Sequence, residues 1–439
     1  MYVIYSFLTY LFFLISSPYF IYKLLTTKKY RTGIKERLGF LDKSLKNIKP
    51  GKRRIWIHAV SVGEVIAASL LIKRIRELWP DEVLILTTVT ETGNNTAKER
   101  INEADIITFF PLDIGWSVHR FKSFLNPDIC IIMETEIWPN FLKIIHDNKT
   151  PVLIVNGRLS EKSYKGYRTG KIFFKKALKN ISAFSMQTDS DAERIILLGA
   201  EKEKVFVTGN LKFDQVFKAG SQMNQDIAGE LMLPTGCKIL VLGSTHSGEE
   251  DILISTFKKL KRKFHDLFLI VAPRHPERFK EVEDLLIKNS IKFCRRTKIK
   301  EEPFPEKEAI LLDTIGELSK IYSIATIVFM GGSLVPVGGH NILEPAVFKK
   351  PVLFGKYMHN FRDIAELFVK SGGGIQVSEP SEIEKEISDL LSNPGRQEEI
   401  GMNAYSLFEK NLGATERNIE IIKKFFPLNS YKYFDDKGT

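Results

Sequence analysis

From residue 55 onward, short runs of aliphatic and β-branched residues alternate with longer stretches in which apolar residues recur at helical spacing. The first run, residues 55–59, is followed by an amphipathic stretch from about Gly63 to Leu78. The other runs that predict strands are 83–87, 106–110, 129–133, 152–155, 204–208, 238–243, 267–272, 310–312, 326–330 and 352–354. Strands that alternate with helices predict an α/β protein with parallel, doubly wound sheets.

The pattern pauses over residues 216–236, a stretch rich in glycine, proline and small polar residues. We interpret it as a linker between two Rossmann-like domains, 26–215 and 237–412, with a C-terminal helix and tail at 413–439. Two domains agree with a length of 439 residues, since domains usually hold roughly 100–200 residues. Two such halves predict a cleft, and ligands of open α/β sheets bind beyond the carboxyl ends of the strands. Polar residues that directly follow a strand are therefore the candidate site residues.

The first 22 residues contain no charged side chain and are long enough to cross a bilayer. A basic segment follows between Lys23 and Arg37, which predicts that the chain beyond it stays on the cytoplasmic side. We therefore predict a membrane anchor over residues 1–25. A cleaved signal peptide would carry its basic residues before the apolar run. A buried or interfacial helix is the other alternative, because Ser16, Ser17 and Pro18 weaken the span.

The net charge of +11 and the pI of about 9.2 indicate an anionic partner, such as nucleic acid, anionic lipid or a phosphorylated substrate. No nucleic-acid-binding motif is present in the sequence. The three cysteines lie far apart, which argues against a structural zinc site and is typical of a reducing compartment. Between Lys162 and Lys179, basic residues alternate with aromatic ones, and this predicts an amphipathic helix that lies on anionic lipid. A solvated charged face is the alternative.

In the first half, Glu64 follows the first strand after Gly63, which permits a tight turn into the next helix. Its carboxylate suits a general base, although an acid at a helix start also stabilises the helix dipole. Glu134 and Glu136 follow the strand at 129–133. With no third ligand nearby, they suit hydrogen bonding to a polyhydroxyl substrate better than metal binding. Lys212 follows the strand at 204–208 and could balance a leaving phosphate, or be an ordinary surface lysine.

In the second half, Arg274 follows a strand, and its planar guanidinium suits phosphate oxygens. Residues 314–317 also open a helix after a strand. A glycine-rich loop over 331–339 leads into a helix predicted to begin near Asn341, where free N–H groups could bind phosphate. Glu344, one turn later, could accept hydrogen bonds from ribose hydroxyls. A tight turn is the alternative, and the sequence carries neither a GxGxxG fingerprint nor a Walker A motif.

Several of these strand-end motifs occur together, in order, in one known family. They are Ser61-Val62-Gly63-Glu64, Glu134-Thr135-Glu136-Ile137-Trp138-Pro139, Asn156-Gly157-Arg158, Gly209-Asn210-Leu211-Lys212-Phe213-Asp214, Ala272-Pro273-Arg274-His275-Pro276-Glu277-Arg278 and Gly338-Gly339-His340-Asn341. With them, the chain resembles the Kdo (3-deoxy-D-manno-octulosonic acid) transferases from the N-terminal segment to about residue 425. The resemblance implies a GT-B glycosyltransferase fold. It also implies inverting transfer of Kdo from CMP-Kdo to the lipid A precursor lipid IVA, without a metal or other cofactor.

The resemblance also assigns roles to individual positions. Glu64 matches the general base, and Glu134 and Lys212 match residues that stabilise the transition state. The positions that match CMP contacts are Pro273, Arg274, Ile315, Gly316, Glu317, Asn341, Ile342, Leu343 and Glu344. The implied partners are CMP-Kdo, the lipid A precursor and membrane lipid, but not nucleic acid. The implied location is the inner membrane, with the catalytic domains on its cytoplasmic face.

Two other functions fit the residues themselves. A related GT-B-like enzyme, such as a nucleotide-sugar 2-epimerase, would use a similar nucleotide pocket but has no evident need for a membrane anchor. A non-catalytic, membrane-bound binding protein would tolerate the loss of Glu64. An assay with CMP-Kdo and a lipid acceptor distinguishes both from a Kdo transferase.

Overall fold

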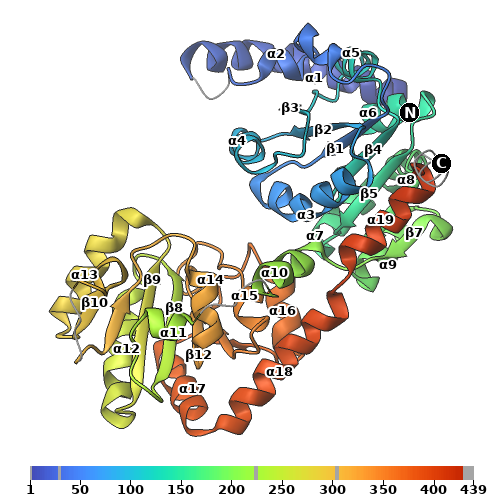
Figure 1. Cartoon of the computed structure of the whole chain (residues 1–439). Coiled ribbons are helices and arrows are strands. Elements are labelled where there is room, and N and C mark those ends of the chain that lie inside the picture. The colour runs from blue at the N-terminus through green and yellow to red at the C-terminus, as the bar shows by residue number, and fades with distance from the viewer. Residues whose placement is uncertain (1, 28–30, 222–225, 302–305, 429–439) are drawn as a thin grey trace, which may run out of the picture. The chain divides into compact units, whose positions relative to one another are not determined.

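The chain forms two compact units, each built around one parallel sheet (Figure 1). The computed structural model describes residues 2–27, 31–221, 226–301 and 306–428. One unit comprises residues 1–215 together with 413–439, and the other comprises 216–412. Among the described residues, each unit contains a sheet of seven strands. The predicted α/β class with parallel sheets is therefore confirmed.

The sheet of the first unit has the strand order β3-β2-β1-β4-β5-β6-β7. Its strands are β1 (Arg54–His58), β2 (Val83–Thr88), β3 (Ile106–Phe109), β4 (Ile129–Met133), β5 (Val152–Gly157), β6 (Ala183–Met186) and β7 (Val205–Val207). The central strands are buried on both faces, and for this reason they read as continuous apolar runs in the sequence. The strand order reverses between β1 and β4, so the switch point where ligands bind lies at their carboxyl ends.

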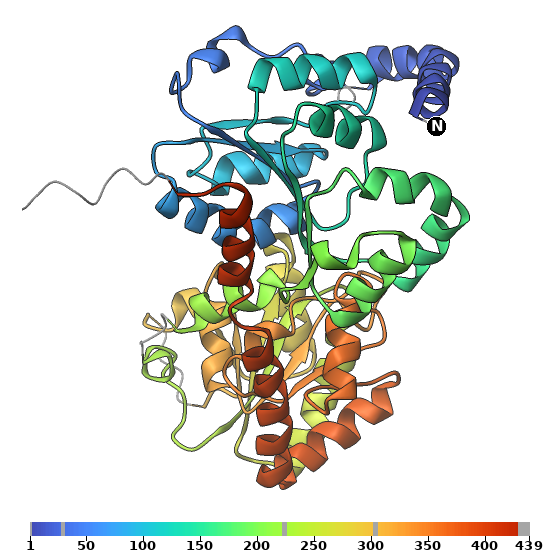
Figure 2. The same ribbon diagram turned by 90° about the vertical axis from the view of Figure 1, so that its right-hand side faces the viewer.

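Helices cover both faces of this sheet. They are α1 (Tyr2–Thr26), α2 (Ile34–Arg37), α3 (Val62–Leu78), α4 (Glu91–Arg100), α5 (Gly115–Leu125), α6 (Pro139–Asp147), α7 (Glu161–Thr169), α8 (Lys171–Leu178), α9 (Asp189–Leu198) and α19 (Ala414–Phe425), with the 3₁₀ turns η2 (Lys43–Asn47) and η3 (Lys202–Lys204). Side chains of α5, α6, α8 and α9 form one core with the sheet. Those of α3, α4 and α19 form the other, where α19, dark red in Figure 2, packs beside α3.

The prediction of one amphipathic helix from Lys162 to Lys179 is wrong. The segment forms two helices, α7 and α8, which meet at Gly170. Gly170 caps both helices and leaves the helical conformation at φ −106° and ψ 25°, as expected for the residue with the lowest helix propensity after proline. Tyr164 and Tyr167 pack against the core, whereas Ile172 is 83% exposed. Only parts of the segment are therefore available to a membrane surface.

Helix α1 contains one apolar stretch, Tyr2–Lys23, that is long enough to cross a membrane by length and composition, with a mean hydropathy of 1.5. None of this stretch is buried in the protein. Its first turns are nevertheless tied to the first unit by side-chain hydrogen bonds. The Tyr5 hydroxyl donates to Asp113 (3.0 Å), and the Ser6 hydroxyl donates to Asn140 (2.7 Å). The candidate anchor is thus attached to the domain that it precedes.

The second unit repeats the architecture, with the strand order β10-β11-β9-β8-β12-β13-β14. Its strands are β8 (Lys238–Thr245), β9 (Leu267–Pro273), β10 (Phe293–Arg295), β11 (Ala309–Leu311), β12 (Ile327–Met330), β13 (Val352–Phe354) and β14 (Ile375–Gln376). Here the order reverses between β8 and β12, which places the second switch point at the ends of those two strands.

Helices and 3₁₀ turns connect the strands of this unit. They are α12 (Glu250–Lys263), α13 (Phe279–Lys288), α14 (Leu318–Ile321), α15 (Leu343–Ala346), α16 (Arg362–Lys370), α17 (Pro380–Ser392) and α18 (Pro394–Asn411), with η4 (Pro276–Arg278), η5 (Arg296–Lys298) and η6 (Tyr322–Ile324). The stretch interpreted as a linker, 216–236, holds the end of α10 (Leu211–Ser221) and the short α11 (Ile227–Glu230). Its residues 222–225, like the C-terminal residues 429–439, lie outside the described residues.

Candidate functional site

Two of the predicted carboxylates flank the switch point of the first sheet. Glu64 follows β1 in the first turn of α3, and Glu134 directly follows β4. Glu136 belongs to the same turn as Glu134, and the charges of both raise the pKa of Glu64. The structure therefore brings these three predicted side chains together at the carboxyl edge.

Glu64 is held in place by its own helix start. Ser61 is the N-cap of α3, and the Glu64 side chain turns back toward the residues before the helix. Its Oε2 accepts a hydrogen bond from the Val60 N–H (2.8 Å), and its Oε1 accepts one from the Ser61 hydroxyl (3.2 Å). As in a capping box, an acid in the third position of the helix reaches back to a backbone N–H group before the helix. The reciprocal bond is absent, because the Ser61 side chain accepts no hydrogen bond from the helix N–H groups. The Glu64 carboxylate therefore both supports the start of α3 and lies at the switch point of the sheet.

The surroundings of Glu64 favour its protonated form. The side chain is only 8% exposed. Burial, followed by the charge of Glu134, raises its pKa to about 8, although the Val60 N–H opposes the change. Burial and Glu134 also raise the pKa of Glu136. A carboxyl group that titrates near pH 8 is matched to proton transfer near neutral pH, and strongly shifted pKa values of this kind cluster at functional sites.

Three strand ends place non-glycine residues in the left-handed region. The φ angles are 57° at Glu134 after β4, 57° at Asn156 in β5, and 55° at Ser244 in β8. A non-glycine residue with this backbone costs about 1–3 kcal/mol, and such residues gather at ligand sites. The turn after β4 is further tied to the end of β5, because the Arg158 N–H donates to the Thr135 hydroxyl (3.0 Å). The backbone at the carboxyl ends of these three strands is therefore held in a conformation that non-glycine residues rarely adopt.

Lys212 lies in the first turn of α10, and a buried polar network holds that turn. The Asn156 Oδ1 accepts a hydrogen bond from the Leu211 N–H (3.0 Å), and the Lys212 N–H donates to the Asn210 Oδ1 (3.0 Å). Gln187 joins the network, since its Nε2 donates to the Asn156 carbonyl (3.0 Å) and its Oε1 accepts from Asn210 (2.9 Å). We had not predicted Gln187 or Asn156 as site residues, because neither carries a charge and their partners lie far away in sequence.

Glu249, just before α12, organises the glycine-rich loop of the second unit, and we had not predicted it as a site residue. It is fully buried. Its Oε1 accepts from the N–H groups of Ser333 (2.9 Å) and Leu334 (2.8 Å), and its Oε2 accepts from those of Gly332 (2.7 Å) and His246 (3.0 Å). One carboxyl group thus joins the ends of β8 and β12 across the switch point.

Close backbone packing explains one glycine of this loop. The Gly331 N–H donates to the Gly243 carbonyl (2.8 Å), which lays the loop against the end of β8. A Cβ atom at Gly331 would lie 2.4 Å from the carbonyl oxygen of Ser244, a distance that no side chain can occupy. The loop and the strand end therefore form one rigid edge, and any side chain at Gly331 would separate them.

Three histidines and Arg274 gather at this edge. The Nε2 atoms of His246 and His340 are 2.8 Å apart, and the two rings are stacked, with a 10° angle between them. His275 meets His246 edge-to-face at 5.3 Å. Burial, together with the charges of His246, Arg274 and His275, lowers the pKa of His340 to about 4. With this pKa, His340 is neutral at pH 7, and the exposed Arg274 supplies a positive charge at this edge.

Glu344 lies beside this cluster. Its carboxylate accepts hydrogen bonds from the Ser319 hydroxyl (3.2 Å) and from the Asn341 Nδ2 (3.4 Å). Burial raises the pKa of Glu344, while these two donors and Arg274 lower it. The helix predicted to begin near Asn341 begins at Leu343 and is only four residues long. A helix of four residues has only a small dipole, so the side chains at this edge, and not the helix start, supply most of the polar groups that a ligand could contact.

The segment 315–317 is the third predicted CMP-contact segment, and Ser319 connects it to Glu344. The Glu317 carboxylate accepts a hydrogen bond from Thr314 and forms an ion pair with Arg296 (2.9 Å). Ile315 is 81% exposed, and Gly316 has a φ of 88° with no atom near its missing Cβ. The segment therefore presents an apolar side chain and an accessible backbone next to Glu344.

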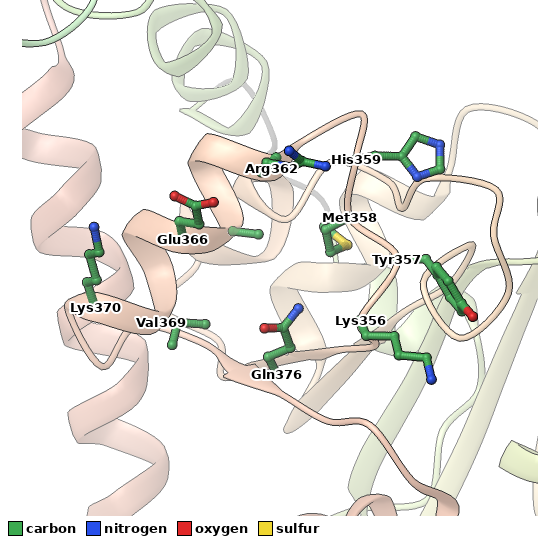
Figure 3. Close-up of a pocket in the computed structure, with 10 residues that line it drawn as sticks. Lys356, Tyr357, Met358, His359, Arg362, Glu366, Val369, Lys370 and Gln376 are labelled. Carbon is green, nitrogen blue, oxygen red and sulfur yellow. The ribbon is translucent and has the colours of Figure 1, made fainter. Parts of the chain in front are cut away.

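A neighbouring groove of about 440 Å³ lies between α16 and the loop after β13 (Figure 3). Lys356 and Met358 line it from the loop, and Glu366 and Lys370 from the helix. Met358 also supports the glycine-rich loop, since a Cβ at Gly339 would lie 2.2 Å from its sulfur. None of the residues predicted to contact CMP lines this groove.

Among the described residues, no group of three or more His, Cys, Asp or Glu side chains could hold a metal ion. The cysteines are all free, and Cys130 and Cys294 are buried. Arg278, which closes one of the quoted motifs, forms a two-pronged ion pair with the buried Glu250 (2.6 and 3.1 Å). Its guanidinium is therefore bound to the Glu250 carboxylate, and this ion pair fixes the chain at the start of α13.

Comparison with known proteins assigns the chain to a family. Residues 32–215 match the family described as 3-deoxy-D-manno-octulosonic-acid transferase (kdotransferase). The chain is 36% identical over 403 residues to the 3-deoxy-D-manno-octulosonic acid transferase of Haemophilus influenzae, covering 91% of this chain and 93% of that protein.

Two solved structures resemble the chain in fold alone. A glycosyltransferase from Rickettsia africae has a TM-score of 0.55 at 15% identity, over 86% of this chain and 100% of that one. The UDP-GlcNAc 2-epimerase from Neisseria meningitidis has a TM-score of 0.58 at 15% identity, over 84% and 100%. The predicted GT-B-like fold is thus confirmed. The family is decided by the 36% sequence identity to the Haemophilus influenzae protein over 91% of this chain. The chain belongs to the 3-deoxy-D-manno-octulosonic acid transferases, and it is a glycosyltransferase.

Proposed function

We propose that this enzyme transfers Kdo from CMP-Kdo to the lipid A precursor lipid IVA, with inversion and with Glu64 as the general base. The observation that carries the proposal is the buried Glu64 carboxyl at the first switch point, whose pKa is raised to about 8. In the reaction, Glu64 takes the proton of the acceptor hydroxyl as that oxygen attacks the anomeric carbon of Kdo. The bond from this carbon to the phosphate oxygen breaks, and CMP leaves.

The other charged residues balance the change in charge. Lys212 and the Arg274 guanidinium stabilise the negative charge that develops on the leaving phosphate. Glu134 lies beside Glu64, where it keeps the pKa of the base high and faces the positive charge that develops on the sugar ring. The second unit holds the nucleotide through the backbone at Pro273, the segment 315–317 and the segment 341–344. Glu344 is placed to accept hydrogen bonds from the ribose.

We also place the enzyme at the inner membrane, with its catalytic units on the cytoplasmic face. The support is the apolar length of α1 and the basic residues that follow it. Acceptor-dependent release of CMP by the purified full-length protein tests the activity. Release of CMP without added lipid, or none with it, contradicts the proposal.

The pH dependence of the reaction follows from the raised pKa of Glu64. A general base acts in its deprotonated form, so kcat/KM should rise about tenfold per pH unit below pH 8 and level off above it. The measurement is kcat/KM for the lipid acceptor between pH 5.5 and 9.5, with the folded fraction checked at each pH. If kcat/KM is already constant above pH 5, the group that titrates is a carboxylate with an ordinary pKa, and this contradicts Glu64 as a base with a raised pKa.

We further predict that the reaction needs no metal ion, because cationic side chains are available to balance the leaving phosphate. Treatment with excess EDTA followed by removal of the chelator should leave kcat within about twofold of the untreated enzyme. The control is a metal-dependent glycosyltransferase assayed in the same buffer, which must lose activity. A large loss that Mg²⁺ or Mn²⁺ restores would contradict the prediction.

A further inference from the structure

An apolar groove lies between α1 and the rest of the first unit, and none of its lining residues has a role in the proposed reaction. It encloses about 370 Å³ and is lined by Leu8, Phe12 and Phe13 of α1, together with Leu112 and Trp138. The α1 side chains recur at the spacing of one helix face. Leu8 is 54% exposed and Phe12 is 61% exposed, so protein atoms leave these apolar side chains largely uncovered.

The only carboxylate that lines the groove is already fully engaged. Asp113 accepts hydrogen bonds from the Phe141 N–H (2.7 Å), the Asn140 N–H (3.1 Å) and the Tyr5 hydroxyl (3.0 Å). Burial raises the pKa of Asp113, which further disfavours a free charge there. A polar or cationic ligand therefore gains little in this groove, whereas an apolar one removes exposed hydrocarbon from water.

The position of the groove suggests which apolar ligand enters it. Its outer wall is the helix long enough to cross a membrane, whose opposite face exposes Val3, Phe7 and Leu14 at 64–81%. Its inner wall includes Trp138, which lies two residues after Glu136 on the turn from β4 to α6. A lipid chain in the groove would thus lead from the hydrocarbon around α1 toward the carboxylates that follow β4.

We propose that this groove binds one acyl chain of the lipid acceptor and so directs the acceptor's sugar hydroxyl to the Glu64 site. The inference rests on the proposed function, because it presumes a lipid acceptor. It makes α1 a wall of the acceptor site in addition to an anchor. Ser6 bonds Asn140 at the start of α6, and Tyr5 bonds Asp113, which itself accepts from N–H groups at the start of α6. These bonds fix that wall to the helix that follows the turn of Glu134 and Glu136.

A photoreactive acceptor tests the position of the chain in the unaltered full-length enzyme. A lipid A precursor with a diazirine on one acyl chain, incubated in mixed micelles without CMP-Kdo, should label peptides that contain Leu8, Phe12 or Leu112. Unlabelled precursor should suppress the labelling, and excess phospholipid should not. If excess phospholipid suppresses the labelling as well as unlabelled precursor does, the groove binds membrane lipid without selectivity and the proposal is overturned. Labelling confined to the opposite face of α1, or none, also overturns it.

A pair of tryptophan variants tests the consequence for turnover. Leu8→Trp fills the groove and should raise the KM for the acylated acceptor about tenfold, the worth of one or two buried methylenes. The KM for CMP-Kdo should not change. Val3→Trp adds the same bulk on the opposite face, at a residue that is 81% exposed, and should leave both constants unchanged. Equal effects of the two variants contradict the proposal. Failure of the proposed function itself looks different, because the unaltered enzyme would then transfer no Kdo to any acceptor.

Discussion

Replacing Glu64 with glutamine lowers kcat for Kdo transfer by about 10³-fold, within the range that general bases contribute. Glutamine keeps the size of the side chain and one acceptor oxygen for the Val60 N–H, but it cannot take a proton. Glu64→Ala should lose as much activity and should also lose the hydrogen bonds to Val60 and Ser61 before the start of α3. CMP affinity should persist in both variants, since the proposed nucleotide contacts belong to the second unit.

Comparing Glu64→Gln with Glu64→Ala distinguishes a role in proton transfer from a role in supporting the start of α3. Glu161→Ala is the matched control, because Glu161 is also a first-turn acid but is exposed and forms a surface ion pair with Lys165. It should leave kcat unchanged. Should Glu64→Gln retain more than a tenth of the activity while Glu64→Ala does not, Glu64 acts through the helix start and is not the base.

The raised pKa of Glu64 also determines whether the free energy of unfolding rises or falls with pH. A folded-state pKa of about 8 against the ordinary 4.5 means that the folded enzyme holds the proton more tightly than the unfolded chain. The stability contributed by Glu64 therefore falls as the pH rises from 4.5 to 8. Glu64→Gln should unfold at a higher denaturant concentration than the unaltered enzyme at pH 9, and the difference should shrink toward pH 5.

Replacing Glu249 with alanine should abolish CMP binding and destabilise the second unit by at least about 3 kcal/mol. The variant leaves four backbone N–H groups, of His246, Gly332, Ser333 and Leu334, without their acceptor, and each such group costs about 1–3 kcal/mol when it stays buried. The measurements are the midpoint of chemical denaturation and the affinity for CMP by calorimetry.

Glu384→Ala is the control for this variant, since Glu384 forms an exposed ion pair with Lys259. Exposed pairs contribute about 0–1 kcal/mol, so its midpoint and CMP affinity should hardly change. Glu249→Gln keeps one good acceptor and should lie between the two. Normal CMP affinity in Glu249→Ala would show that the glycine-rich loop keeps its shape without the buried carboxylate.

Much of the fold was predictable because both sheets are parallel and buried on both faces, and their strands therefore read as uninterrupted apolar runs. The predicted strand at 129–133 and the helix from about Gly63 to Leu78 agree with β4 and α3 to within one residue. Glu64 and Glu134 could be singled out because each follows such a run directly. The strands β6, β10 and β14 were not predicted, since runs of two to four residues carry too little periodicity.

The parts that were missed depend on contacts between distant residues. Glu249 acts on a loop 83–85 residues away, and nothing near it in the sequence marks it as more than a helix-start acid. The break at Gly170 was missed because the spacing of charged and aromatic residues continues through it. The docking of Tyr5 on Asp113 is likewise invisible in a sequence where residues 1–22 read as a plain apolar helix.

The central claim is tested most directly by mass spectrometry of the lipid product. The purified full-length enzyme is incubated with CMP-Kdo and lipid IVA, and the lipid fraction is compared with the reaction of Glu64→Gln. We predict that the precursor gains the mass of one or more Kdo residues with the unaltered enzyme and stays unmodified with the variant. An unmodified precursor in both reactions, or equal modification in both, would contradict the account.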